Sequence, residues 1–188
     1  MTHDRVKHQR RSVRLTEYNY AQPGACFITI CTINRECLLG EMADGAVLLN
    51  AFGDIAVDEW LRTPVVRHNV SLDAFVVMPN HVHGIIIITH EKVDAPTVRR
   101  GDPAGRPYMA KRAHGPAPGS VSAIVGQFKA AATKRINVLR GTSGVSVWQR
   151  NYYEHVMRDE GELNQIRQYI TDNPASWETD DNNPNRHT

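Results

Sequence analysis

The segment from His81 to Ile88 constrains the fold of this chain more than any other part of the sequence. It reads HVHGIIII, and its β-branched residues favour an extended backbone over a helix. A turn at 78–80 joins it to an earlier apolar segment at 73–77, so the sequence predicts a β-hairpin. Because residues i and i+2 of a strand face the same side, we expect the side chains of His81 and His83 to point the same way.

This pair of histidines needs an explanation, because two polar side chains on an otherwise apolar strand are costly to bury without partners. One explanation is that both imidazoles bind the same metal ion. The other is that they are core histidines whose nitrogens are satisfied by hydrogen bonds. The string alone does not decide between the two.

The spacing of apolar residues, and the turn residues that separate them, predict the other elements. We expect strands at 26–33, 47–49 and 145–148, and helices from Asn50 to Arg62, from Ser120 to Arg140 and from Asp159 to just before Pro174. Strands and helices in this order predict an α+β fold of the ferredoxin-like type. In this fold we expect an antiparallel sheet with helices on one face and an open face that carries the histidines.

The length of 188 residues suits one domain. We expect a basic N-terminal arm at 1–22, a single domain at 23–177 and a polar tail at 178–188. Within the domain, the segment 95–119 is rich in proline and glycine and is expected to form a flexible insertion. The tail is expected to be disordered from Asp180 onward.

The charge pattern bears on the partner and the compartment. A formal net charge of +2 does not by itself indicate nucleic acid, but basic residues gather at 5–14 and at 99–112. These segments either follow a phosphate backbone or are solvated and flexible. No aliphatic stretch is long enough to cross a bilayer, and the first residues lack the apolar core of a secretory signal, so we expect no membrane association and a cytoplasmic location. The three cysteines have no zinc-site spacing and are expected to be reduced.

The last expected helix carries a second polar pair. Tyr169 and Asn173 are four residues apart, so their side chains are neighbours on the helix surface. Each also has a structural interpretation. An Asn just before a proline is a common helix terminator, and a half-buried tyrosine often anchors a helix.

Three ordered segments together resemble a known family. They are Pro79–His83, Trp148–His155 and Arg167–Pro174, with the sequences PNHVH, WQRNYYEH and RQYITDNP. They are similar to the corresponding segments of the single-tyrosine transposases with a His-hydrophobe-His motif. Within that superfamily the resemblance is strongest to the transposases associated with repetitive extragenic palindromic (REP) elements. It runs from about Pro23 to Trp177.

The resemblance implies a ferredoxin-like nuclease fold, the HUH endonuclease fold, with 23–177 as the catalytic domain. It implies that the protein binds single-stranded DNA near a hairpin and cleaves and rejoins it through a 5′-phosphotyrosine intermediate. By position, the resemblance implies that Tyr169 is the nucleophile and that His81, His83 and Asn173 are the protein ligands of a divalent metal ion. A homodimer is one option for the assembly.

Basic and aromatic side chains contact phosphates and stack on bases in single-stranded DNA. We expect DNA contacts from Arg11, Arg14, Lys129, Lys134, Trp148, Arg150, Tyr152 and Arg158. For Trp148 and Tyr152, packing in the core or at a sheet edge is the alternative.

These groups suit the implied chemistry. Two imidazoles and an amide oxygen fit Mg²⁺ or Mn²⁺ in an open octahedral site, and the nitrogens favour Mn²⁺. Exchange of one phosphodiester for another retains the bond energy, so no nucleotide cofactor is expected, and the chain has no Walker-type glycine loop. The group that takes the tyrosine proton is not identified. His155 is one candidate, with a purely structural role as its alternative.

Two other functions fit the same pattern. A catalytically inactive module on the same fold would bind single-stranded nucleic acid without forming a covalent adduct. A metallohydrolase that uses metal-bound water would not need Tyr169 at all.

Overall fold

The computed structural model describes residues 22–89 and 116–186. Residues 1–21 of the expected arm, with Arg11 and Arg14, and residues 95–115 of the expected insertion lie outside the described residues. The elements in chain order are β1 (Gly24–Cys31), the 3-10 helix η1 (Ile33–Arg35), β2 (Gly40–Ala43), β3 (Ala46–Leu49), α1 (Ala51–Leu61), α2 (Thr63–Val66), β4 (Val70–Met78), β5 (His81–Ile88), α3 (Val121–Leu139), β6 (Tyr153–Val156), α4 (Glu160–Asp172) and the 3-10 helix η2 (Trp177–Thr179).

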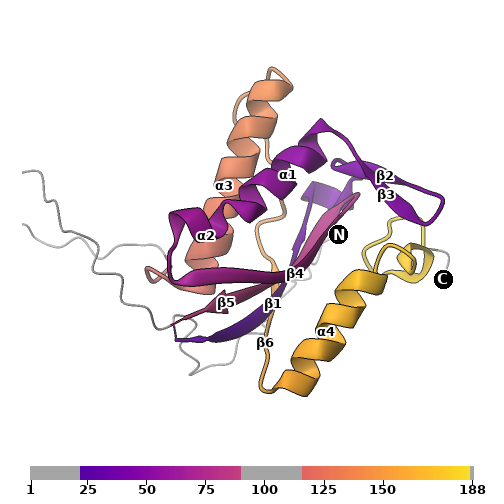
Figure 1. Ribbon diagram of the computed structural model, residues 1–188. Coiled ribbons are helices and arrows are strands. Elements are labelled where there is room, and N and C mark those ends of the chain that lie inside the picture. The colour runs from indigo at the N-terminus through magenta and orange to yellow at the C-terminus, as the bar shows by residue number, and fades with distance from the viewer. Residues whose placement is uncertain (1–21, 90–115, 187–188) are drawn as a thin grey trace, which may run out of the picture.

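Four of the strands form one antiparallel sheet in the order β4-β5-β1-β6, as Figure 1 shows. The expected hairpin is β4 and β5, and β5 lies between β4 and β1. The chain therefore leaves β1, crosses through α1 and returns as β4 with one strand between them, which is the split βαβ arrangement of ferredoxin-like folds. The α+β class and the ferredoxin-like sheet are confirmed.

The two faces of the sheet carry different helices. On one face, Ile28, Val82 and Ile86 pack with Trp60 of α1 and Phe128 of α3 in the main core. On the other face, a smaller cluster joins Phe27, Ile85, Met157 and Ile170 of α4, with Leu163 and Ile166 packed against it.

The expectation that all helices lie on one face is therefore wrong for α4, which covers part of the opposite face (Figure 1). The reason is that α4 is amphipathic, and the apolar side chains of Phe27 and Ile85 give its apolar stripe a surface to cover. The face that carries the histidines is thus not open. It forms one wall of a site whose other wall is α4.

The expected strand at 145–148 is also wrong. Trp148 makes a single β-bridge to Thr32, and the edge strand of the sheet is β6, which pairs with β1. The apolar side chains of Val147 and Trp148 are buried in the main core without forming a strand. The sequence of β6, YEHV, is largely polar and therefore did not predict a strand. Apolar content marks burial as readily as it marks a strand.

The expected helix starts are confirmed by their caps. The side chain of Asn50 accepts hydrogen bonds from the backbone N–H groups of the first turn of α1, and Ser120 and Asp159 do the same for α3 and α4. The expected strand at 47–49 is one arm of the β2–β3 hairpin, whose turn residues Asp44 and Gly45 both have positive φ.

No helix within the two described ranges is both long enough and apolar enough to span a bilayer.

Gly84 of β5 provides a test of the packing on the main-core face. A Cβ at this position would lie 2.3 Å from Cζ2 of the Trp60 ring. We expect Gly84→Ala to lower the free energy of unfolding by about 1–3 kcal/mol, because the indole must move out of a filled core. Urea denaturation measures this change.

Gly126 is the matched control, since a Cβ there would meet nothing within 4 Å in the middle of α3. Gly126→Ala should raise the free energy of unfolding by roughly 0.5–1 kcal/mol. Equal effects of the two substitutions would show that Gly84 is not tightly packed.

Candidate active site

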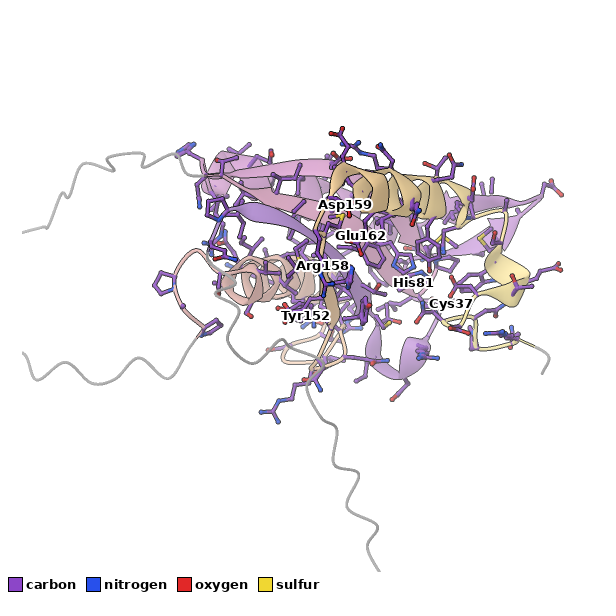
Figure 2. The ribbon with its side chains drawn as sticks, turned by 90° about the horizontal axis from the view of Figure 1, so that it is seen from below. Cys37, His81, Tyr152, Arg158, Asp159 and Glu162 are labelled. Carbon is purple, nitrogen blue, oxygen red and sulfur yellow. The ribbon has the colours of Figure 1, made fainter. Side chains whose placement is uncertain are left out.

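His81 and His83 lie side by side on β5, with ring centroids 4.4 Å apart, and both are buried (Figure 2 labels His81). Nδ1 of His81 is 2.8 Å from Oδ1 of Asn80. The amide nitrogen of Asn80 donates to the carbonyl oxygens of Arg35 and Asn182, so its Oδ1 faces the imidazole and can only accept. His81 therefore donates from Nδ1–H, and its Nε2 carries a lone pair.

His83 has the same arrangement. Its Nδ1 is 2.8 Å from Oγ1 of Thr29 on β1, and its Nε2 is 3.2 Å from the hydroxyl of Tyr169 on α4. With the tyrosine O–H donating to Nε2, the imidazole donates from Nδ1–H to Thr29. Strand and turn residues thus hold both Nδ1 atoms and leave both Nε2 atoms facing the site.

Both imidazoles are held in their neutral form. Burial lowers the pKa of His81 to about 4, and burial together with the neighbouring His81 lowers the pKa of His83 to about 3, with Asp180 opposing both shifts. At neutral pH each ring is therefore uncharged. This is the form in which histidine binds metal ions.

Tyr169 combines an anchored ring with a hydroxyl that reaches the histidines. Its ring lies edge-on to Phe27, with centroids 6.0 Å apart, while 47% of the residue is exposed. Burial and the nearby carboxylate of Asp180 raise the pKa of its hydroxyl, against a smaller lowering by Asn173, so the phenol is protonated at neutral pH. Tyr169 therefore both anchors α4 on the sheet and places its hydroxyl at the site.

Asn173 follows α4 and is more than a helix terminator. Its backbone remains helical, its side chain is buried, and its amide nitrogen donates to Oδ2 of Asp180 over 2.8 Å. Within the described residues, Oδ1 of Asn173 and Nε2 of His81 are buried without a hydrogen-bond partner. Unsatisfied buried acceptors are costly in a protein interior, and a cation between them would satisfy both.

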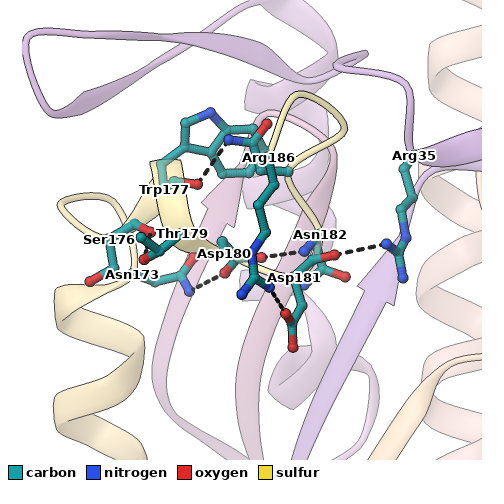
Figure 3. Close-up of polar contacts among 10 residues, drawn as sticks. Arg35, Asn173, Ser176, Trp177, Thr179, Asp180, Asp181, Asn182 and Arg186 are labelled. Carbon is teal, nitrogen blue, oxygen red and sulfur yellow. Dashed lines mark hydrogen bonds and ion pairs between the residues drawn. The ribbon is translucent and has the colours of Figure 1, made fainter. Parts of the chain in front are cut away.

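Asp180 is the site residue that the sequence did not reveal. The expectation of disorder from Asp180 onward is wrong for the described part of that segment, because Asp180 is only 8% exposed and lies beside the histidines. Figure 3 shows it next to Asn173 and Asn182. Trp177 stacks on the ring of His81, with centroids 6.1 Å apart, and this aromatic residue was the available signal that the segment packs on the domain.

The donor atoms present suit a divalent cation. The ligand atoms of His81, His83 and Asp180 all lie within 4.8 Å of one another. Together with Oδ1 of Asn173 they offer two nitrogen and two oxygen donors and no thiolate. Such a set suits Mg²⁺ or Mn²⁺, with the nitrogens favouring Mn²⁺, and does not resemble a structural zinc site.

The expected DNA contacts divide into exposed and engaged side chains. Lys134, Arg150 and Arg158 are exposed, and Arg158 lies at the start of α4 near Glu162 (Figure 2). Lys129 instead donates to the carbonyl oxygens of Gln149 and Asn151, and burial lowers its pKa to about 8.

The two aromatic residues of this set are also engaged. Trp148 is buried against Phe128, so the packing alternative is correct for it and its ring is not free to stack on a base. Tyr152 donates its hydroxyl to Glu154 and is half-buried. Nζ of Lys129 lies 5.4 Å from the centroid of the Tyr152 ring, and Tyr152 lines the cleft described next.

An open cleft lies directly beside His83 and Tyr169. Its lining includes Phe27, Thr29, Gln149 and Tyr153. Tyr153 is 47% exposed and lies edge-on to Phe27, so an aromatic surface is available where the predicted Trp148 is not. His155, the candidate base, pairs through Nε2 with Glu162, which favours its structural alternative.

An ion pair fixes α4 over the sheet. Arg167 donates from Nε and Nη2 to the two carboxylate oxygens of Asp73, over 2.9 and 2.6 Å, at the irregular part of β4. Tyr169 follows two residues later on the same helix. The pair therefore helps to set the position of the tyrosine.

We expect Asp73→Asn to lower the melting temperature by roughly 2–4 °C at pH 7. The hydrogen bonds from Arg167 hold the pKa of Asp73 below its usual value of 3.8. Because the folded pKa is the lower one, this stability is present above pH 3.8 and is lost as the pH falls further. Melting curves at several pH values measure the difference between wild type and variant.

Asp58→Asn is the control, since Asp58 pairs with Arg135 between α1 and α3, away from this face. It removes an equivalent charge without touching α4. Equal adduct yields in the DNA assay below for Asp73→Asn and Asp58→Asn would show that the Arg167 pair does not position Tyr169.

No family model matches this chain. An uncharacterized protein from Haemophilus influenzae is 40% identical over 176 residues, which cover 92% of each chain. Among solved structures, a REP-associated tyrosine transposase bound to a REP hairpin matches with a TM-score of 0.53 and 19% identity, over 86% of this chain and 74% of that one. A candidate transposase from Deinococcus radiodurans R1 gives a TM-score of 0.42 and 18% identity, over 85% and 95% of the two chains.

The first of these structures shows a shared fold, and at 19% identity it shows nothing beyond the fold. The Haemophilus influenzae relative is similar over almost its whole length. The chain belongs to the family of that protein, on the fold of a REP-associated tyrosine transposase.

Proposed function

We propose that this protein is a metal-dependent, single-stranded DNA endonuclease and transposase that cleaves and rejoins DNA near hairpins through a 5′-phosphotyrosine intermediate. The observation that carries the proposal is the hydroxyl of Tyr169, 3.2 Å from Nε2 of His83, at a buried cluster of metal-ligating atoms. A nucleophile beside a cation site is the minimum that phosphodiester exchange requires.

The reaction balances without water or a nucleotide. The oxygen of Tyr169 forms a bond to phosphorus as the bond from phosphorus to the 3′ oxygen breaks, and the phenolic proton ends on that 3′ oxygen. The products are a 5′-phosphotyrosine and a free 3′ hydroxyl. The reverse reaction, with a different 3′ hydroxyl as the attacking group, rejoins strands.

The chain's own residues orient the nucleophile. Phe27 supports the edge of the tyrosine ring, and the Arg167–Asp73 pair fixes the helix that carries it. The hydroxyl lies within hydrogen-bond distance of Nε2 of His83, so its oxygen is beside the cluster; once an ion took the lone pair of Nε2, the hydroxyl would no longer donate to it. A nucleophile held in this way reaches phosphorus with little further loss of entropy.

His81, His83 and Asn173 are the residues that would hold the divalent ion, Mg²⁺ or Mn²⁺. When bound, such an ion supplies positive charge that stabilises the phosphate oxygens and the leaving oxygen. The unpartnered Nε2 of His81 and Oδ1 of Asn173 support this assignment.

Single-stranded DNA is the substrate class that the cleft supports, because the unstacked bases of a single strand can stack on the exposed ring of Tyr153, whereas the bases of a duplex are stacked on one another. Exposed Lys134, Arg150 and Arg158 provide positive charge for the phosphates. The hairpin requirement rests on the structural neighbour, which is bound to a REP hairpin.

The test uses hairpin-containing single strands from the flanks of the protein's own gene, with Mn²⁺, followed by denaturing gel electrophoresis. We expect a label at the 3′ end of the DNA to migrate with the protein, and a label at the 5′ end to appear in a shorter free fragment. Cleavage without an adduct would indicate the metallohydrolase alternative, and binding without cleavage the inactive module. Either outcome would overturn the proposal.

A further inference from the structure

We propose that Asp180 is a fourth protein ligand of the divalent ion, beside His81, His83 and Asn173. The inference rests on the metal site of the proposed function, and it adds a ligand from the segment after α4. One oxygen of Asp180 lies within 4.8 Å of the ligand nitrogens of both histidines. One cation can bind side chains whose donor atoms are separated by such distances.

Two hydrogen bonds orient the carboxylate of Asp180 and leave lone pairs on it that can bind a cation. Oδ2 accepts one hydrogen bond from the amide of Asn173, over 2.8 Å, and Oδ1 accepts one from the backbone N–H of Asn182, over 2.6 Å. A carboxylate offers about four acceptor positions, so two remain. Because the amide nitrogen of Asn173 faces Asp180, the amide oxygen of Asn173 points away from Asp180. This oxygen has no hydrogen-bond partner among the described residues.

The segment that carries Asp180 is fixed by contacts on both sides of the residue, and Figure 3 draws one of them, the hydrogen bond from Arg35 to Asp181. Before it, Trp177 stacks on the ring of His81. After it, Arg35 donates to the carbonyl oxygen of Asp181, and Asn80 donates to that of Asn182. Asn80 thus holds both the imidazole of His81 and the segment of Asp180, so one residue fixes two of the four proposed ligands.

The charge at the site calls for a cation. Among the described residues, no lysine or arginine forms an ion pair with Asp180. A buried carboxylate of this kind is stable when paired or bound to a metal.

The alternative is that Asp180 only holds the side chain of Asn173. Asp180→Asn separates the two roles, because an amide oxygen can still accept the hydrogen bond from Asn173 but supplies neither the charge nor a carboxylate ligand. The experiment is a titration of the full chain with Mn²⁺, in which electron paramagnetic resonance measures the free ion. Circular dichroism verifies that each variant is folded.

We expect both Asp180→Asn and Asp180→Ala to weaken Mn²⁺ binding at least about tenfold. Asp181→Asn is the matched control, since Asp181 is the adjacent residue, its side chain is exposed, and its loss removes the same charge. Its affinity should stay within about twofold of the wild type. Wild-type affinity for Asp180→Asn would overturn the inference.

A second measurement needs no variant. In a six-coordinate site, four protein ligands leave room for two water molecules on Mn²⁺, and pulsed resonance in deuterated water counts them. Two or fewer support Asp180 as a ligand, and three contradict it. Binding that depends on Asp180 in a protein that forms no DNA adduct would leave this inference intact and overturn only the proposed function.

Discussion

Replacement of Tyr169 with phenylalanine is expected to abolish the covalent adduct with DNA, by at least about 10⁴-fold, as for the loss of other catalytic nucleophiles. The substitution removes only the hydroxyl oxygen. The ring contact with Phe27 remains, so α4 should stay in place and the melting temperature should change little. DNA affinity should also change little, because other side chains are proposed to contact the phosphates.

Tyr153→Phe is the matched control for this prediction. Tyr153 is exposed to the same degree as Tyr169 and lies against the same Phe27 ring, but it is on β6 and has no hydrogen bond to His83 among the described contacts. The Tyr153 variant should still form the adduct. An adduct with Tyr169→Phe, measured on the same labelled strands, would show that another tyrosine attacks.

The second large effect is expected at the histidines. The double variant His81→Ala and His83→Ala removes both neutral imidazoles, so we expect metal-dependent cleavage to fall by on the order of 10³-fold. Cleavage is measured as a function of Mn²⁺ concentration. Because both residues are buried, circular dichroism must show that the variant is folded.

His68 is the control for the double histidine variant. His68 lies between α2 and β4, away from the cluster, and its replacement with alanine should leave the Mn²⁺ dependence unchanged. Unchanged cleavage by the double histidine variant would exclude a metal role for β5, and the pair would then be core histidines.

The sequence predicted those parts of the site that depend on local periodicity. The period of two placed His81 and His83 on one face of a strand, and the spacing of four placed Tyr169 beside Asn173. Helix starts were predicted because caps are local, as at Asn50. The order of elements then predicted the ferredoxin-like sheet.

The sequence could not predict what depends on contacts between distant segments. The face that α4 covers is decided by Phe27, more than 130 positions earlier in the chain, as well as by the helix itself. Tryptophan is a residue type that stacks on DNA bases, but Trp148 is buried because its ring packs against Phe128. Asp180 follows a proline and a turn, and only its contacts with the histidine strand bring it to the site.

The central claim is that Tyr169 attacks DNA at the site formed by β5 and α4. The most direct test is mass spectrometry of the adduct after nuclease trimming and proteolysis. The account predicts a nucleotide linked through its 5′ phosphate to the peptide that contains Tyr169. The same mass on a peptide containing Tyr152 or Tyr153, or no modified peptide from a cleavage-competent protein, would contradict it.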